Sequence, residues 1–170
     1  QHQMWSAQFL SVRKPRTFFT SGGLGTMGYG LPAAIGVQLG LPDKLVIDVA
    51  GDGSIQMNIQ EMATAVQNKL PVKIVILNNT YLGMVRQWQE LFYKHNYSST
   101  SMTGPPDFVK LAEAYGAEGY RIMTEEELAP TLKKALASPN TAIIDVVVEP
   151  EEDVYPMVPA GASLDEMLLV

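Results

Sequence analysis

The chain has 170 residues, of which 46% are hydrophobic and 18% are charged. These proportions are typical of one folded domain with a substantial core, and they exclude a disordered segment. The net charge of −6 argues against nucleic acid as a partner, because polyanion binding needs local positive potential. The absence of cysteine excludes disulfides, thiolate nucleophiles and cysteine metal sites. The longest apolar runs, 72–77 and 142–148, are far shorter than the ~20 residues that cross a bilayer, so we expect no membrane segment.

Hydrophobic spacing and turn residues predict helices that alternate with strands. In chain order we expect a helix over 4–12, a short apolar segment over 17–20, a helix over 31–39, a strand over 45–50, a helix over about 59–68, a strand over 72–77, helices over 82–93, 108–115 and 124–136, and a last strand over 143–148. Asp107 is the expected N-cap of one helix and Gly116 its expected end. Thr124 with Glu127 predicts a capping box at the start of another helix.

This alternation predicts an α/β fold, with a mainly parallel sheet flanked by helices on both faces. We expect one domain over 1–150 and a surface tail over 151–170. The sequence begins without Met and without a charged and then apolar leader, so we interpret it as a fragment of a longer polypeptide. In parallel sheets, ligands bind beyond the carboxyl ends of the strands, and the residues that end strands are therefore the functional candidates.

The first candidate site is the glycine-rich loop at 23–28, which matches the pattern G-x-G-x-x-G ahead of a helix. Backbone donors in such a loop can cradle a pyrophosphate at a helix N-terminus, so the loop suggests a dinucleotide site. The apolar segment before it makes a poor strand, however. Taken alone, the loop is better interpreted as a structural turn.

The second candidate combines two strand ends. Gly51-Asp52-Gly53-Ser54 follows the strand over 45–50, and Asn78-Asn79 ends the next strand. A parallel crossover brings Asp52 and Asn79 to the same edge of the sheet, where a carboxylate and an amide oxygen suit a hard cation such as Mg²⁺. The glycines let backbone N–H groups approach a diphosphate, and we expect a helix that begins at Ser54 to favour an anion. Each motif alone is explained as a turn, but the pair resembles the thiamine diphosphate motif.

The whole sequence resembles the C-terminal cofactor domain of acetohydroxyacid synthase catalytic subunits, also called acetolactate synthases. The resemblance is carried by the opening Q-H-Q-M-W, the segment 21–28, the G-D-G-S and N-N motifs, the segment L-G-M-V-R-Q-W over 82–88, and the tail P-M-V-P-A-G-A over 156–162. The cofactor motifs are shared with decarboxylases, oxidases and ligases. The opening and the 82–88 segment are similar to the branched-chain amino-acid type.

The resemblance implies a role for each matching position. These are Mg²⁺ ligands at Asp52, Asn79 and Tyr81, the last through its backbone carbonyl; cofactor contacts at His2, Gly25, Met27, Gly53, Ser54 and Met84; and substrate-pocket residues at Val85 and Trp88. Met27 is also implied to hold the cofactor in a bent shape. On its spacing alone, Trp88 fits a core position as well as a substrate filter.

The resemblance further implies that thiamine diphosphate and Mg²⁺ serve to decarboxylate pyruvate and to join the two-carbon unit to a second 2-ketoacid, in valine, leucine and isoleucine biosynthesis. No catalytic residue is expected in this sequence, because the family's activating glutamate comes from the N-terminal domain of a partner subunit. The chain alone is therefore expected to be inactive.

The expected full-length enzyme binds FAD in a central domain and forms a homodimer or homotetramer, and a regulatory small subunit is compatible with it. The tail over 151–170 is expected to cover the active site. The expected compartment is the bacterial cytoplasm, with the plastid as the alternative.

Other classes of function stay open at this stage. Another thiamine diphosphate-dependent 2-ketoacid decarboxylase or oxidase would share the cofactor motifs. A nicotinamide-dinucleotide module would use the 23–28 loop but leaves the pairing of Asp52 with Asn79 unexplained. A catalytically silent domain could keep the fold, and only the activity of the full-length protein separates it from an enzyme.

Overall fold

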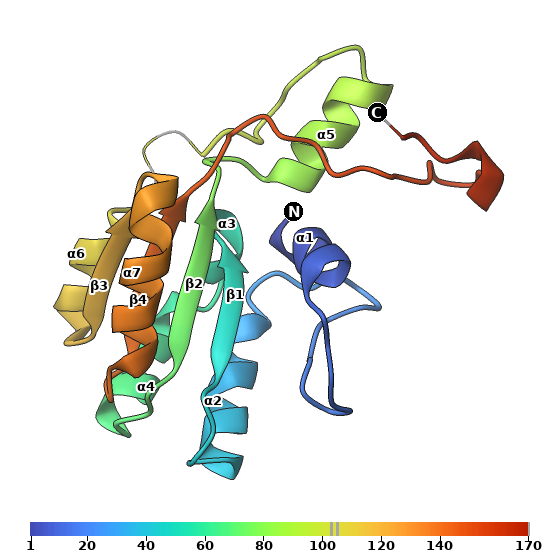
Figure 1. The fold of residues 1–170 in the computed structure, drawn as a ribbon. Helices are drawn as coiled ribbons and strands as arrows, with labels where there is room; N and C mark the ends of the chain where they lie inside the picture. The colour runs from blue at the N-terminus through green and yellow to red at the C-terminus, as the bar shows by residue number, and fades with distance from the viewer. Residues whose placement is uncertain (103, 105, 170) are drawn as a thin grey trace.

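A computed structural model describes residues 1–102, 104 and 106–169. At its centre lies a four-stranded, all-parallel sheet in the order β1-β2-β4-β3 (Figure 1). The strands are β1 (Ile47–Gly51), β2 (Lys73–Asn78), β3 (Glu118–Ile122) and β4 (Ala142–Val147). The sequences of β1, β2 and β4 are rich in β-branched residues, which suits strands that are covered on both faces. The predicted parallel α/β fold is confirmed.

Helices cover both faces of this sheet. The helices of the described chain are α1 (His2–Phe9), α2 (Gly30–Gly40), α3 (Asp52–Ile55), α4 (Met62–Gln67), α5 (Gly83–Phe92), α6 (Phe108–Tyr115) and α7 (Glu125–Ala137). There are also 3₁₀ turns, η1 (Ile59–Glu61) and η2 (Leu164–Glu166). Helices α2, α4 and α6 pack on one face, and α7 packs on the other over β3 and β4 (Figure 1). Helix α5 lies beyond the carboxyl end of the sheet. None of the helices in the described ranges is long and apolar enough to cross a membrane.

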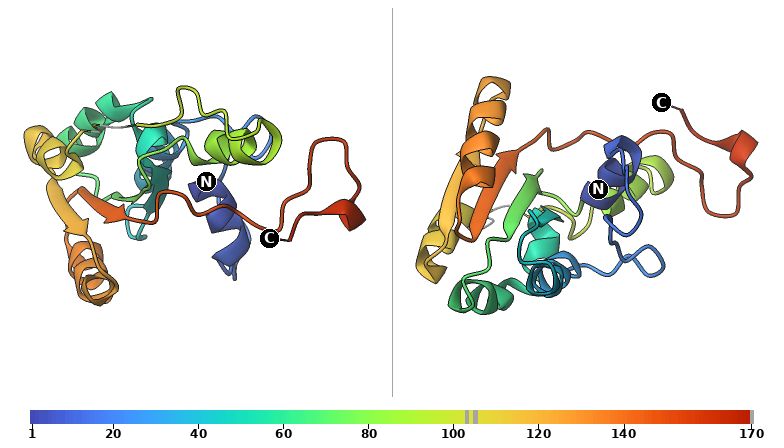
Figure 2. Two further views of the ribbon diagram at one scale, coloured as in Figure 1. Left: turned by 90° about the horizontal axis from the view of Figure 1, so that it is seen from above. Right: turned by 60° about the horizontal axis from the view of Figure 1, so that its bottom comes forward.

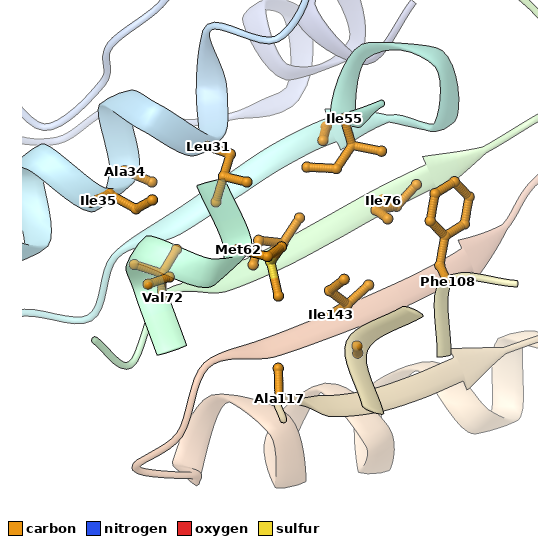
Figure 3. Packing of buried hydrophobic residues seen from close by; sticks show 14 of the residues in the cluster. Leu31, Ala34, Ile35, Ile55, Met62, Val72, Ile76, Phe108, Ala117 and Ile143 are labelled. Atoms are coloured by element: carbon orange, nitrogen blue, oxygen red, sulfur yellow. The ribbon is translucent and has the colours of Figure 1, made fainter. Parts of the chain in front are cut away.

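The larger core lies between the sheet and helices α2, α4 and α6 (Figure 3). Met62, Ile76, Phe108 and Ile143 are completely buried at its centre. Because side chains alternate along a strand, the opposite faces of the same strands contribute to the smaller core under α7, which includes Ile144. The two cores hold the strands in register, and the register fixes which residues emerge together at the sheet edge.

The apolar segment 17–20, for which no element was predicted, forms neither helix nor strand. The sequence predictions fail at two places. Strand β3 was not predicted because it is an edge strand in which only Ile122 is fully buried, so its sequence lacks an apolar run. Thr124 is the N-cap of α7 but makes no capping hydrogen bond with described residues, and the Glu127 carboxylate accepts instead from the backbone N–H of Met123 at 2.8 Å. The predicted capping box is therefore wrong.

Other boundaries move by a few residues. Helix α1 begins at His2 and ends at Phe9, before the predicted end at Val12. The helix predicted over 59–68 is a 3₁₀ turn followed by α4. The Asp107 cap is confirmed, because its side chain accepts from the N–H groups of Val109 and Lys110, and Gly116 ends α6 in the left-handed conformation.

A tight contact between α6 and β3 leads to a stability prediction. A Cβ atom at Gly119 would lie 2.7 Å from the backbone oxygen of Val109 and 2.9 Å from its Cα. Backbone atoms cannot rotate away, so Gly119→Ala must displace α6, and we expect a loss of about 1–3 kcal/mol in unfolding free energy. Gly36 on α2 is the matched control, because no described atom lies within 4 Å of its Cβ position. Gly36→Ala should stabilise by up to about 1 kcal/mol, and urea titration of both variants checks the contrast.

The segment after β4 passes between α1 and α5 (Figure 2). The Gln87 side chain of α5 pairs with the backbone of Val154, donating to its carbonyl at 2.9 Å and accepting from its N–H at 3.0 Å. Gln8 of α1 donates to the Tyr155 carbonyl at 3.2 Å. Arg86, only 4% exposed, bonds the Glu151 carbonyl and the Asp153 carboxylate, each at 3.3 Å. Helices α1 and α5 are thus both bonded to the segment 151–155 beyond the carboxyl edge of the sheet.

Candidate active site

A cavity of about 430 Å³ opens at the carboxyl ends of β1 and β2. Its walls come from α1, the glycine loop, the turn after β1, the turn after β2, the start of α5 and the segment after β4. The lining residues are Gln1, His2, Gln3, Met4, Trp5, Phe9, Gly25, Met27, Gly51, Asp52, Gly53, Ser54, Leu77, Asn79, Tyr81, Leu82, Gly83, Met84, Val85, Val148, Glu149 and Glu152. The position agrees with the rule that parallel sheets bind ligands beyond their carboxyl ends.

Asp52 lies on the floor of this cavity because β1 and β2 are adjacent. Gly51 pairs with Leu77 across the two strands, so the residues that follow each strand emerge side by side. Asp52 is 1% exposed, and its Oδ2 atom has no hydrogen-bond partner among the described residues. Burial raises the pKa of Asp52 to about 6, although hydrogen bonds from backbone N–H groups, including that of Thr80, act in the opposite direction. A buried carboxylate oxygen without a partner is costly unless a ligand or a proton compensates it.

Asn79 is held beside it by two hydrogen bonds. Its Nδ2 donates to Oε1 of Gln1 at 2.8 Å, and its Oδ1 accepts from the backbone N–H of Tyr81 at 3.2 Å. The described residues contain no cluster of three or more His, Asp or Glu side chains that could hold a metal by themselves. A cation here would have Asp52 as its one carboxylate, and amide, backbone and ligand oxygens would complete the shell. That composition suits Mg²⁺, which commonly shares its shell with phosphate oxygens.

Gly53 is closely packed, and the structure has no room for a side chain at this position. A Cβ atom at this position would lie 2.6 Å from Leu82 Cδ2, 2.9 Å from Met102 Sδ and 3.5 Å from Met27 Cε. Any side chain at position 53 would therefore occupy space next to Met27. The glycine loop and the G-D-G-S turn, which the sequence offers as separate candidate sites, thus lie next to each other in the structure.

Ser54 joins the two glycine-containing segments. Its hydroxyl accepts from the backbone N–H of Gly28 at 3.0 Å, and Asn58 Nδ2 donates to the Gly28 carbonyl at 2.8 Å. Gly25 and Gly28 have φ angles of 62° and 81°, which other residues rarely adopt. The helix expected to begin at Ser54 instead begins at Asp52 and is a single turn, α3. Met57 and Asn58, which follow this turn, lie close to Gly28.

His2 stands at the edge of the site, against Gly51. A Cβ atom at Gly51 would lie 2.7 Å from His2 Nδ1. Burial is the main cause that lowers the pKa of His2 to about 4. The imidazole is therefore neutral at physiological pH, with one nitrogen as donor and the other as acceptor.

All of the predicted site residues except Trp88 line the cavity. Trp88 is 45% exposed on α5 and does not belong to the described lining. Its role as a substrate filter stays a prediction.

Several lining residues on α1 and on the segment after β4 were not predicted from the sequence. Trp5 and Phe9 are stacked with their ring centroids 5.8 Å apart, and they form an apolar wall. The sequence spacing predicts only a helix here, and in the structure no residue of α1 is fully buried. Apolar residues on a helix that joins no core are the signal of a ligand-facing or partner-facing wall.

Comparison with known proteins shows which family this chain is similar to. Residues 1–146 match the family described as "Thiamine pyrophosphate enzyme, C-terminal TPP binding domain". The chain is 53% identical over 168 residues to the mitochondrial acetolactate synthase catalytic subunit of Saccharomyces cerevisiae, covering 99% of this chain and 24% of the yeast protein. It is 52% identical over 172 residues to the acetolactate synthase isozyme 3 large subunit of Escherichia coli, covering 99% and 30%.

A solved structure agrees with these relatives. The thiamine diphosphate-dependent 4-hydroxybenzoylformate decarboxylase of Rhodococcus jostii RHA1 matches with a TM-score of 0.68 and 39% identity, over 76% of this chain and 24% of that one. The chain spans only about a quarter to a third of the curated relatives, 24% and 30% for the yeast and E. coli proteins. The resemblance to acetolactate synthase large subunits is confirmed, and the chain belongs to the thiamine pyrophosphate enzymes as their C-terminal TPP-binding domain.

Proposed function

We propose that this chain is the cofactor-binding portion of an acetolactate synthase that decarboxylates pyruvate and transfers the two-carbon unit to a second 2-ketoacid. The observation that carries the proposal is the pair Asp52 and Asn79, which end adjacent parallel strands on the floor of the cavity. The identity to acetolactate synthases over 99% of the chain supports this choice over other members of the family. The product would be a precursor of branched-chain amino acids.

The residues present fit thiamine diphosphate and Mg²⁺. Asp52 offers a buried oxygen without a described partner, and Gly53, which has no side chain, lets Leu82 and Met102 pack directly against the turn beside it. In this proposal Mg²⁺ is bound by the side chains of Asp52 and Asn79 and by the Tyr81 carbonyl. The remaining contacts to the cofactor are assigned to His2, Gly25, Met27, Gly53, Ser54 and Met84, with Val85 facing the substrate.

When bound, thiamine diphosphate supplies the electron sink for decarboxylation. The chain supplies orientation and charge. Asp52 balances the cation, Asn79 orients it, and the apolar wall of Trp5 and Phe9 limits access of water. Two carboxylates, Glu149 and Glu152, also line the cavity, but both residues are exposed. We therefore propose that the glutamate that activates the cofactor lies in a region outside this chain.

The test uses the full-length protein that contains this sequence. We expect it to retain thiamine diphosphate through gel filtration only when Mg²⁺ is present, to bind no NAD under the same conditions, and to form acetolactate from pyruvate. Glu149→Gln and Glu152→Gln should remain active, whereas the 170-residue chain alone should form no acetolactate. Retention of NAD in place of thiamine diphosphate, or retention of cofactor without any 2-ketoacid turnover, would contradict the proposal.

A substitution of Trp88 tests the assigned substrate entrance. Pocket discrimination over one methylene is worth only about 1–3 kcal/mol, so Trp88→Leu should change the choice between pyruvate and 2-ketobutyrate as second substrate by about ten-fold or more. Competition assays with both ketoacids in the full-length enzyme measure this ratio. An unchanged ratio together with lower thermal stability would show that Trp88 serves only packing.

The assembly and the location of the enzyme are further parts of the proposal. We propose a homodimer or homotetramer, FAD in another domain, a regulatory small subunit as a candidate partner, and a tail over 151–170 that covers the bound cofactor. The hydrogen bonds of Gln87 to Val154 support this position of the tail. We propose a bacterial cytoplasmic enzyme, while named relatives are mitochondrial in yeast and chloroplastic in Nicotiana tabacum.

A further inference from the structure

A line of polar side chains crosses three strands next to the proposed metal site. Arg121 of β3 donates from Nε to Oδ2 of Asp145 on β4 at 3.0 Å, and Asn78 of β2 donates from Nδ2 to Oδ1 of Asp145 at 2.9 Å. Arg121 and Asp145 are direct partners in the β3–β4 register. Arg121 also donates from Nη2 to Asp107, the N-cap of α6, at 2.7 Å. The three strands are thus connected by side chains as well as by their backbones.

The central carboxylate is deeply buried. Asp145 is 1% exposed and Asn78 is 7% exposed. Both oxygens of Asp145 are used, one by a cationic donor and one by an amide, so its charge is compensated and its orientation is fixed. Neither Arg121 nor Asp145 lines the cavity in the described chain. An ion pair here is weak evidence for stability, because apolar residues commonly fill such positions at no loss.

Asn78 connects Asp145 by hydrogen bonds to the turn that contains Asn79. Its Oδ1 accepts from the backbone N–H of Thr80 at 3.3 Å, an N–H that is shared with Asp52, while its Nδ2 is committed to Asp145. Thr80 has φ of 59°, a left-handed conformation that costs a non-glycine residue about 1–2 kcal/mol. The bond from Thr80 to Asn78 helps to hold that conformation, and the turn it shapes presents Asn79 and Tyr81 to the cavity. If Asn78 rotated, its amide would present a donor to the Thr80 N–H, and this bond would be lost.

We propose that Arg121 and Asp145 are positioning residues for the metal-binding turn Asn79–Tyr81 and act on it through Asn78. This inference rests on the proposed function, because it assigns a purpose to the turn that the proposed Mg²⁺ occupies. Groups that orient metal ligands from behind usually change metal affinity by about 10–100-fold when they are replaced.

The experiment exchanges donor and acceptor in the full-length protein. Asn78→Asp places two carboxylates face to face, and Asp145→Asn places two amides face to face. Each change therefore disrupts the hydrogen bonds that connect Arg121, position 145 and position 78. The double variant Asn78→Asp with Asp145→Asn restores these bonds, because the new amide at 145 can donate to position 78 and accept from Arg121, and the new carboxylate at 78 still accepts from Thr80. We expect the dissociation constant for Mg²⁺, measured by calorimetry with saturating thiamine diphosphate, to rise at least ten-fold in each single variant and to return to within about three-fold of the wild-type value in the double.

A surface pair of variants keeps the test valid if the buried single variants fold poorly. Arg121→Gln removes the donor to Asp145 from a side chain that is 39% exposed. Lys110→Gln removes the same charge from the other cation near Asp107, whose Nζ lies 3.8 Å from that carboxylate and does not reach Asp145. We expect weaker Mg²⁺ binding by about ten-fold for Arg121→Gln and an unchanged dissociation constant for Lys110→Gln.

The outcomes separate the two proposals. If the unaltered protein shows no Mg²⁺-dependent binding of thiamine diphosphate, the proposed function fails and the inference fails with it. If the unaltered protein binds but Arg121→Gln binds Mg²⁺ equally well, or the double exchange does not rescue the singles, only the inference is overturned. Lower melting temperatures with unchanged Mg²⁺ affinity would show that the line serves only folding.

Discussion

Replacing Asp52 with Asn should nearly abolish activity in the full-length enzyme. The amide keeps the shape of the side chain but removes the negative charge that would balance Mg²⁺ beside a diphosphate. We expect at least a 100-fold rise in the dissociation constant of Mg²⁺, a loss of the corresponding size in kcat/KM, and only partial rescue at saturating metal and cofactor. Calorimetry and steady-state kinetics measure the two effects.

Thermal unfolding distinguishes a lost metal ligand from a damaged fold. Asp52 has a buried oxygen without a described partner, so removing its charge should leave the metal-free protein equally stable or more stable. The stabilisation of the wild type by Mg²⁺ and thiamine diphosphate, about 2.7 kcal/mol at a hundred times the dissociation constant, should disappear in the variant. Unchanged cofactor affinity in Asp52→Asn would exclude the proposed metal site.

Replacing Asp48 with Asn should change how stability depends on pH. Asp48 is 5% exposed on β1, and burial raises its pKa to about 6 from the ordinary 3.8. Between these pH values Asp48 holds a proton in the folded state that it has released in the unfolded chain. The contribution of Asp48 to stability is therefore most favourable at low pH and becomes less favourable as the pH rises to about 6. The cost above that pH approaches about 3 kcal/mol, since each pKa unit is worth about 1.4 kcal/mol.

The start of α2 reduces this cost, because Asp48 packs against Gly30 and the positive end of a helix favours an anion. We therefore expect Asp48→Asn to be about 1–3 kcal/mol more stable than the wild type at pH 7.5, and the two proteins to converge below pH 4. Urea titrations across this range measure the difference. Asp43→Asn, which removes the same charge from an exposed turn, should follow the wild type. A steep fall of stability with pH that persists in Asp48→Asn would assign it to another group.

The parts of the site that were predictable are those encoded by strand ends. Asp52 and Asn79 could be paired from sequence because two short apolar runs with a helical segment between them commonly form adjacent parallel strands. The position of each side chain then follows from the register alone, and Gly51 opposite Leu77 is that register. Gly53 and Ser54 came with the same motif.

The features that were not predicted depend on contacts between segments that are distant in the sequence. Gln1 reaches Asn79 and the Glu152 carbonyl, and nothing in the local pattern of a terminal glutamine predicts either bond. Strand β3 escaped detection because an edge strand needs few apolar residues. Arg121 and Asp145 were not singled out either, since their relation appears only once β3 and β4 are known to be neighbours.

The way α1 is attached has a consequence for motion. No residue of α1 is fully buried, and its described side-chain bonds run to the segments around 20 and 155, whereas β2 is paired on both sides. Regions with few buried contacts open at a lower free energy than the whole molecule unfolds. Backbone amides of α1 should therefore exchange with solvent deuterium through local opening, and those of β2 only through global unfolding. We therefore expect this wall of the cavity to open while the sheet and the turn Asn79–Tyr81 stay folded, which would give a cofactor a path into and out of the folded protein.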